Sequence, residues 1–300
     1  SLDAIRTYYG TPVLHEPTWR SDIGWYLFTG GLAGASSVLA AGAELAGARQ
    51  VARTARLAAL AGIGVSPVFL VRDLGRPARA ANMLRVLRPT SPMSVGSWLL
   101  TAYGPLAGGA AVGELLGRLP RAGRVAGFAA AALGPAVATY TGVLVADTAI
   151  PAWHEARRVL PYLFAASAAA SAGGVVSAVL PSEQAVLGRR LGAMGAAGEV
   201  LIAERMVSSL GDVGRPYHEG LAGRFQRMAK ILGISSAVLL SFGGKRRWAT
   251  AMGGAAGVTG AACQRFAILN AGRQSARDPN ATVGPQRRRL QRTGRPTRLR

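Results

Sequence analysis

The sequence predicts an all-α membrane protein with eight transmembrane helices, arranged as two parallel four-helix bundles. Three observations support this fold class. Half of the 300 residues are hydrophobic and Gly is abundant, and small residues allow helices to pack closely in lipid. Several charge-free runs reach the roughly 20 residues that cross about 30 Å of hydrocarbon. Two landmarks also recur at offsets of 136 and 139 residues, which indicates a duplicated helical unit.

The repeated landmarks lie at matching points of the two halves. Tyr26-Leu27-Phe28 in the first apolar span is matched by Tyr162-Leu163-Phe164. The turn Asp73-Leu74-Gly75-Arg76-Pro77 is matched by Asp212-Val213-Gly214-Arg215-Pro216. Because each repeat has four predicted helices, the two copies would have the same orientation in the membrane, unlike the inverted repeats of many transporters.

The first four helices are predicted from apolar runs and from the residues that end them. The helix at 22–45 covers a charge-free run, and the helix at 52–71 stops before the Asp-x-Gly-Arg-Pro turn, where glycine and proline end helices. The helix at 94–116 follows a proline-containing loop, and the helix at 124–146 ends before Asp147.

The second four helices repeat this pattern with one polar exception. The helices at 160–180, 224–242 and 247–270 contain charge-free runs. The helix at 185–207 is the most polar, because it carries Glu199 and Glu204 with several arginines. A charge inside a bilayer is costly, so these groups are expected to face protein, a partner charge or water.

The net charge of +21 does not predict a nucleic-acid-binding protein, because the arginines lie mainly in loops and near the C-terminus. Residues 271–300 are rich in Arg and poor in apolar residues, so we expect a disordered basic tail that contacts anionic lipid or a partner protein. The single cysteine, Cys263, excludes an intrachain disulfide.

We expect a multi-pass protein of the plasma membrane. The first apolar span lacks a compact cationic start and a cleavage site, so we expect it to be retained as a helix. The terminal-side loops and tail hold 22 Lys or Arg residues and the other loops hold 11, which favours cytoplasmic termini. The charge density of the short loops favours the reverse orientation.

Polar and aromatic residues gather in the first half, on the side of the membrane where both termini lie. His15 precedes the first helix, Ser94 and Trp98 begin the third, and Tyr140 and Thr141 lie near the end of the fourth. The predicted organisation is an interfacial segment at 1–21, a first bundle with the site at 22–146, a connecting loop at 147–159, a second bundle at 160–270 and the tail at 271–300.

Each candidate residue has a structural interpretation beside a functional one. The Asp-x-Gly-Arg-Pro turn occurs in both repeats, which favours a shared structural corner. His15 is either an interfacial polar residue or a group that binds a quinone carbonyl and passes a proton. Tyr140 is either an interhelical hydrogen-bonding residue or a ligand of the other carbonyl. Trp19, Trp98 and Trp153 fit an interfacial aromatic belt, or alternatively the wall of a pocket.

The histidines give no support for haem or zinc. His15, His154 and His218 all lie in predicted loops, whereas a membrane b-type haem needs axial ligands within the helices. Three dispersed histidines and one distant cysteine also form no zinc ligand set. We therefore expect neither haem nor metal in this chain.

Two segments of the first half resemble the signature of the NrfD/PsrC family, the membrane subunits of polysulfide-reductase-type molybdoenzymes. They are Arg-Asp-Leu-Gly-Arg-Pro at 72–77 and Pro-Thr-Ser-Pro-Met-Ser-Val-Gly-Ser-Trp at 89–98. The segments at 8–19 and 140–153 are similar as well, so the resemblance covers roughly residues 8–270.

The resemblance implies a haem-free subunit that exchanges electrons between a quinone, with menaquinone favoured, and a ferredoxin-like iron–sulfur partner bound to a molybdopterin subunit. It implies a quinone site in the first bundle. The resemblance implies that His15 and Tyr140 contact the quinone. We predict that His15, Tyr140 and Asp73 are the catalytic residues, and that the further quinone contacts are Arg72, Arg76, Ser94, Trp98 and Thr141. Family members often carry an Asn near the histidine, where this chain offers Thr11, Glu16 and Thr18.

Two other functions remain open from the sequence. Asp147, Glu199 and Glu204 are candidates for a proton path, which predicts a proton-conducting or transport subunit. A buried structural ion pair is the competing interpretation of Glu199. A purely structural membrane anchor, with no quinone site, is the third possibility.

Overall fold

The computed structural model describes residues 17, 19–74, 82, 84–117, 120–244 and 246–278. The described residues form helices and connecting segments, which confirms the predicted all-α class. His15 and Arg76 lie outside the described residues. The long helices are α1 (Ser21–Leu45), α2 (Arg49–Leu74), α4 (Pro92–Leu116), α5 (Pro120–Ala146), α7 (Leu160–Val179), α8 (Val186–Ser209), α9 (Gly220–Phe242) and α10 (Arg247–Arg277).

Each predicted helix therefore has a counterpart in the structure, and the sequence explains most of the boundaries. Ser91 caps α4 by accepting a hydrogen bond from the Ser94 backbone N–H, and Pro92 occupies the first turn, where no backbone donor is needed. Gly117 ends α4 with a φ of 59°, a left-handed conformation that glycine adopts without steric cost.

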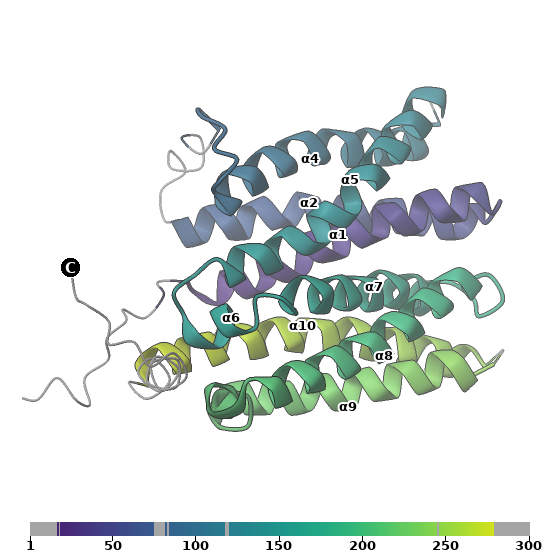
Figure 1. Cartoon of the computed structure of the whole chain (residues 1–300). Coiled ribbons are helices and arrows are strands. Elements are labelled where there is room, and N and C mark those ends of the chain that lie inside the picture. The colour runs from purple at the N-terminus through teal and green to yellow at the C-terminus, as the bar shows by residue number, and fades with distance from the viewer. Residues whose placement is uncertain are drawn as a thin grey trace, which may run out of the picture.

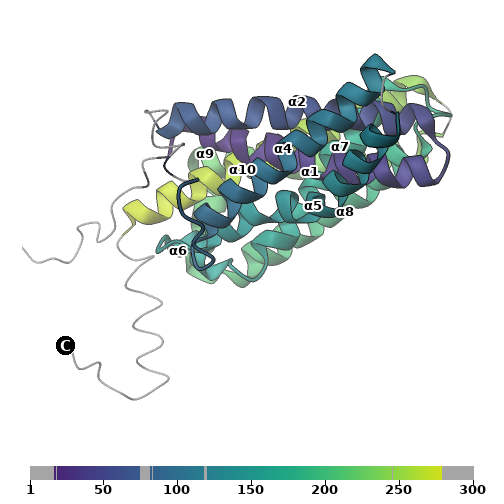
Figure 2. The same ribbon diagram turned by 90° about the horizontal axis from the view of Figure 1, so that it is seen from above.

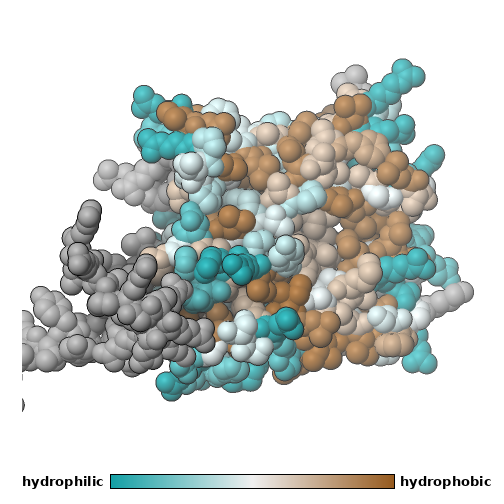
Figure 3. Space-filling view, viewed as in Figure 1, coloured by the Kyte–Doolittle hydropathy of each residue, from teal (hydrophilic) through white to brown (hydrophobic). Residues whose placement is uncertain are grey.

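Five of the long helices are apolar enough over their length to cross a membrane. They are the helices at Ser21–Leu45, Arg49–Asp73, Pro92–Leu116, Pro120–Ala146 and Leu160–Val179. The charges on α8, α9 and α10 lower the hydropathy of those helices. Figure 3 shows hydrophobic residues over much of the middle of one face, with hydrophilic residues toward its two ends. This distribution is typical of a multi-pass membrane protein.

The long helices pack in two groups (Figures 1 and 2). In the first group, α1 packs on α2 and α5, and α4 packs on α5 and α2. In the second group, α7 packs on α8 and α10, and α9 packs on α10 and α8. The groups meet mainly where α7 contacts α1 and α5.

A pair of glycines forms a close helix crossing in each group. A Cβ on Gly34 of α1 would lie 2.5 Å from the carbonyl oxygen of Gly134 on α5, and a Cβ on Gly134 would lie 2.6 Å from that of Gly34. In the second group, Gly174 of α7 and Gly254 of α10 stand in the same relation, at 2.7 and 2.4 Å. The matching crossings support the duplication inferred from the repeated sequence landmarks.

Two short helices lie in connections that were predicted to be loops. The connecting loop at 147–159 contains α6 (Pro151–Glu155). The second Asp-x-Gly-Arg-Pro turn lies within the 3₁₀ helix η1 (Gly211–Tyr217), where burial raises the pKa of the Tyr217 phenol and keeps it neutral.

Helix α10 corrects the predicted start of the tail. The helix does not end at residue 270 but continues to Arg277, so a disordered tail beginning at 271 is wrong for this stretch. The reason is packing, because the small residues Ala271, Gly272 and Ser275 are buried. The Ser275 hydroxyl also accepts a hydrogen bond from the Ala152 backbone N–H of α6 at 3.3 Å.

Candidate functional site

The helix ends predicted to carry the site lie at one end of the molecule. We call this end, where α1 begins and α10 ends, the terminal face, and the other end the opposite face (Figure 1). Helices α2 and α5 end at the terminal face, α4 begins there, and α6 lies there. Asp73, Ser94 and Tyr140 therefore lie on elements that converge, as the sequence predicted.

Two buried tyrosines form the centre of the candidate site. The phenol oxygen of Tyr26 on α1 is hydrogen-bonded to that of Tyr140 on α5, and both side chains are buried. Gly96 of α4 makes room for the Tyr140 ring, because a Cβ at Gly96 would lie 2.5 Å from Tyr140 Cε2. One phenol of the pair donates to the other, so the accepting phenol keeps its own O–H proton for a ligand oxygen.

Two buried hydroxyls lack a hydrogen-bond partner among the described residues. One follows Tyr140 in the sequence, and the other lies beside α1. Thr141, next to Tyr140, is fully buried, and its Oγ1 has no hydrogen-bond partner among the described residues. Ser66 of α2 is also fully buried without such a partner, and its Oγ lies 3.5 Å from the Cβ position of Gly30. Buried polar groups are normally paired, so these hydroxyls mark places where a polar ligand or water would be stabilised.

Ser94 holds the loop before α4 in place. Its hydroxyl accepts a hydrogen bond from Arg88 N–H at 3.0 Å and donates one to the Val86 carbonyl oxygen at 3.2 Å. An open surface hollow of about 390 Å³ lies against the loop. The residues lining that hollow are Asn82, Arg85, Val86, Arg88, Ser91, Met93 and Ser94. Trp98, one turn further along α4, is 39% exposed, which suits its interpretation as an interfacial residue.

Asp73, the first residue of the first Asp-x-Gly-Arg-Pro segment, connects two helices. Asp73 Oδ1 accepts a hydrogen bond from the Arg20 backbone N–H at 2.8 Å, and so links the end of α2 to the start of α1. Arg72 lies 3.8 Å from the Asp22 carboxylate, with 67% of its side chain exposed. These contacts favour the structural interpretation of the turn.

Replacing Asp73 with alanine is expected to lower the free energy of unfolding by about 1 kcal/mol, because the Arg20 N–H loses its acceptor. Asp73→Asn retains a side-chain oxygen and should stay close to the wild-type stability. Thermal unfolding of the detergent-solubilised protein measures both changes. An Asp73→Ala variant as stable as wild type would show that this hydrogen bond does not stabilise the link between α2 and the start of α1.

The interpretation of Trp153 as an interfacial belt residue is wrong. Trp153 is fully buried, stacks on Trp19 with ring centroids 5.2 Å apart, and donates from Nε1 to the Ile268 carbonyl oxygen at 2.7 Å. Gly272 of α10 accommodates the indole, since a Cβ there would lie 1.9 Å from Trp153 Cε2. Arg273 then donates to the Trp19 carbonyl oxygen. We call these residues the tryptophan lock.

The structure separates the three acidic residues proposed for a proton path. Glu204 is exposed and pairs with Lys230 at 2.8 Å, and Asp147 is exposed at the end of α5. Glu199 is 3% exposed, with Oε1 unpaired among the described residues. Its electrostatic partner is Arg265 of α10, which is 1% exposed.

Sequence reasoning missed Arg265 and Tyr26. Arg265 Nη2 donates to the Phe164 carbonyl oxygen at 3.1 Å, and the guanidinium lies 3.6 Å from the Phe164 ring centroid. The sequence did indicate a special role for Arg265, because this residue directly follows a charge-free run and a charge inside an apolar helix needs a partner. Tyr26 was noted only as a landmark of the repeat.

Comparison with known proteins decides the family. A family model described as "Polysulphide reductase, NrfD" matches residues 14–181. The chain belongs to the NrfD family. A search of curated proteins found no match. The matched region contains the first group, α6 and α7, including both tyrosines of the candidate site. NrfD membership confirms the predicted resemblance and indicates a membrane subunit of a molybdoenzyme-type complex.

Proposed function

We propose that this NrfD-family chain is a haem-free quinone-binding subunit of a molybdopterin oxidoreductase complex. It would pass electrons between a menaquinone or ubiquinone pool and a ferredoxin-like iron–sulfur partner. The observation that carries this proposal is the buried Tyr26–Tyr140 hydroxyl pair, with the buried and unpaired Thr141 following Tyr140 in the sequence. The formate-dehydrogenase-like and sulfur-compound oxidoreductases are the partner classes proposed.

The membrane arrangement proposed here has eight spans in two parallel bundles. Helices α8 and α9 support it by exposing apolar side chains along their length, including Met194, Leu201, Ile231 and Val238. The charged or polar residues of these helices at Glu199 and Gln226 point inward and are buried. The terminal face, which we place in the cytoplasm, would then receive the iron–sulfur partner.

The residues present fit a quinone headgroup, which supplies two carbonyl oxygens that accept hydrogen bonds. The phenol of the tyrosine pair that keeps its proton would donate to one carbonyl oxygen, and His15 would donate to the other. Thr141 offers a further donor in an otherwise apolar setting. Asp73, Arg72, Arg76 and the start of α4 with Ser94 and Trp98 would border the site toward the terminal face.

Binding of a fluorescent hydroxyquinoline N-oxide, an analogue of quinones, tests this function on the purified protein. Tyr140→Phe and Tyr26→Phe should each weaken binding by about tenfold, because a hydrogen bond in an apolar site is lost. His15→Ala should weaken it as well. Quenching of the analogue's fluorescence measures the dissociation constants.

Tyr162→Phe is the matched control for this experiment. Tyr162 is the repeat counterpart of Tyr26 but is 70% exposed, so its phenol should not affect binding. Failure of the wild-type protein to bind the analogue would support a purely structural anchor. Unchanged affinity in both tyrosine variants would remove the site from this pair.

A proton-conducting subunit is the second candidate, and the buried Glu199 with its unpaired Oε1 favours it. In proteoliposomes of the intact complex, proton uptake during quinone turnover would fall in a Glu199→Gln variant if Glu199 carried protons. Unchanged uptake would remove Glu199 from such a path.

A further inference from the structure

One face of α1 lies against a polar side chain at nearly every turn. Tyr26 bonds Tyr140 at the terminal end, and Gly30 lies beside the Ser66 hydroxyl one turn later. The Ala33 carbonyl oxygen accepts from the Tyr103 phenol at 2.6 Å. Positions 26, 30 and 33 share a face because three or four residues make one helical turn.

The same face continues to the opposite end of the first group. Ser37 is hydrogen-bonded to the Tyr103 phenol at 2.7 Å, so this phenol joins two successive turns of α1. Both side chains are buried. Two turns further on, Glu44 lies at the opposite face. We call the series from Glu44 through Ser37, Tyr103 and Ser66 to the tyrosine pair the polar line.

The polar line ends at the opposite face in a cluster of four charges. Arg56 of α2 donates to both Glu44 and Glu114, and the bond to Glu114 measures 2.5 Å. Arg124 of α5 donates to Glu44 at 2.8 Å. Only 12% of the Arg56 side chain and 20% of the Glu44 side chain are exposed.

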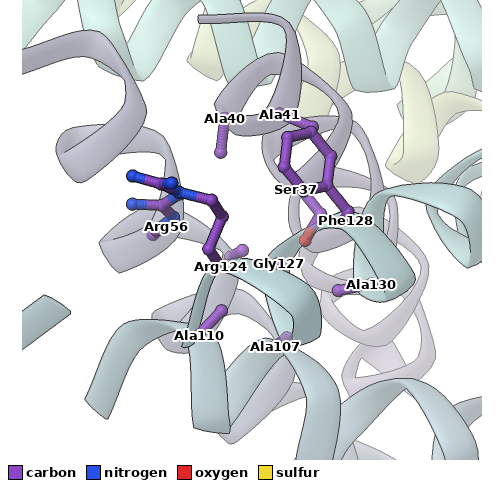
Figure 4. A pocket seen from close by; sticks show the side chains of 11 residues that line it. Ser37, Ala40, Ala41, Arg56, Ala107, Ala110, Arg124, Gly127, Phe128 and Ala130 are labelled. Carbon is purple, nitrogen blue, oxygen red and sulfur yellow. The ribbon is translucent and has the colours of Figure 1, made fainter. Parts of the chain in front are cut away.

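Two hollows lie beside this cluster, and they share part of their lining. The outer one has a volume of about 210 Å³ and is lined by Glu44, Arg56, Glu114 and Arg124. The inner one, of about 10 Å³, has room for about one water molecule. Arg56 and Arg124 line both hollows, and Ser37 lies on the wall of the inner one (Figure 4). The two hollows therefore adjoin between the charged cluster and Ser37.

The helix scaffold does not require these polar groups. At the spacing of the repeated Tyr-Leu-Phe motif, Gly30, Ala33 and Ser37 correspond to Ala, Ala and Gly in α7, and Glu44 corresponds to Leu180, directly after α7. The arginines at the opposite face also have different acceptors in the two groups. In the second group, Arg189 and Arg247 donate to backbone carbonyl oxygens, whereas Arg56 and Arg124 in the first group donate to carboxylates. The backbone acceptors in the second group are those of Leu240, Gly244, Ser177, Ala178 and Val179.

We propose that the polar line is the route by which protons pass between water at the opposite face and the Tyr26–Tyr140 site. This inference rests on the quinone function proposed above. Reduction of a quinone to a quinol takes up two electrons and two protons. The iron–sulfur partner supplies the electrons at the terminal face, and the polar line supplies the protons from the other side. Quinol oxidation runs both flows in reverse.

Cysteine accessibility tests the route without any quinone. Cys263 is the single cysteine, so a Cys263→Ser background leaves one thiol in each variant. In that background, Ser37→Cys should react with Ag⁺, a membrane-impermeant thiol-reactive ion about as small as a water molecule, when it is added to sealed vesicles. Ala46→Cys, in the exposed α1–α2 connection, identifies the side of the opposite face.

Val38→Cys is the matched control, because Val38 is adjacent on α1 but is 41% exposed on the outside of the helix group. Ser37→Cys should react from the side that labels Ala46→Cys, and at least tenfold faster than Val38→Cys. Labelling no faster than Val38→Cys, or labelling only from the terminal side, would overturn the proposed route.

Turnover provides the second measurement. In the intact complex, Ser37→Ala and Tyr103→Phe should slow quinone-linked turnover about tenfold and leave the affinity for the quinone analogue unchanged. Ser177→Ala is the control, since this buried hydroxyl of α7 bonds only within the second group. Normal turnover in both variants would refute the route even if Ser37→Cys reacts. Absence of analogue binding in wild type would instead refute the quinone site.

Discussion

Arg265→Met is expected to lower the free energy of unfolding by about 1–3 kcal/mol, because it takes away the buried positive charge that favours the buried Glu199 carboxylate. The substitution also removes the bond to the Phe164 carbonyl oxygen and the contact with the Phe164 ring. Thermal unfolding in detergent and the yield of folded protein should both fall.

A second substitution separates charge from packing. Glu199→Gln combined with Arg265→Met removes both charges, so the double variant should be more stable than Arg265→Met alone. Lys230→Met is the matched control. It removes the ion-pair partner of Glu204, and Glu204 lies on α8, as Glu199 does. That pair is about half exposed, and its loss should cost no more than about 1 kcal/mol. Equal effects of Arg265→Met and Lys230→Met would contradict a stabilising role for the buried pair.

Gly34→Leu is expected to prevent α1 from packing against α5 in the first group. Even a Cβ at Gly34 would meet the Gly134 carbonyl oxygen at 2.5 Å, and backbone cannot move aside as a side chain can. We expect Gly34→Ala to cost about 1–3 kcal/mol, the usual range for overpacking, and Gly34→Leu to cost more. Thermal unfolding measures the first variant, and the recovery of monodisperse protein measures the second.

Gly42 provides the control on the same helix. No atom lies within 4 Å of a Cβ at Gly42, so Gly42→Ala should be neutral or stabilising by up to about 1 kcal/mol. Gly254→Ala in the second group should behave like Gly34→Ala, because its Cβ would lie 2.4 Å from the Gly174 carbonyl oxygen. A tolerated Gly34→Ala would show that the α1–α5 crossing is looser than described.

The helices were predictable because each apolar run has a clear beginning and end. Pro92 and Gly117 bound α4, and the structure places both where the sequence suggested a boundary. The end of α10 was not predictable in this way. Arg265 and Arg273 suggest a helix that leaves the membrane. In the structure, however, Arg265 contacts Phe164 and Arg273 donates to the Trp19 carbonyl oxygen within the fold.

The candidate site was predictable only in part. Tyr140 was identified from the family resemblance, whereas Tyr26 was not assigned a role, because a pairing across 114 positions leaves no local pattern. Arg56 and Arg124 were counted as loop charges that set membrane topology. Their pairing with Glu44, 12 and 80 positions away, becomes visible only when the helices are packed.

The tryptophan lock sets an order on how the protein is made. Trp153 reaches its buried position only when Gly272 and the Ile268 carbonyl oxygen are present, and Trp19 is bound by Arg273. These partners belong to α10, which leaves the ribosome after the other described helices. The contacts between α10 and the segment before α1 therefore form only late in synthesis. A chain arrested before α10 would lack the tryptophan lock, although the helices of its first half are already made.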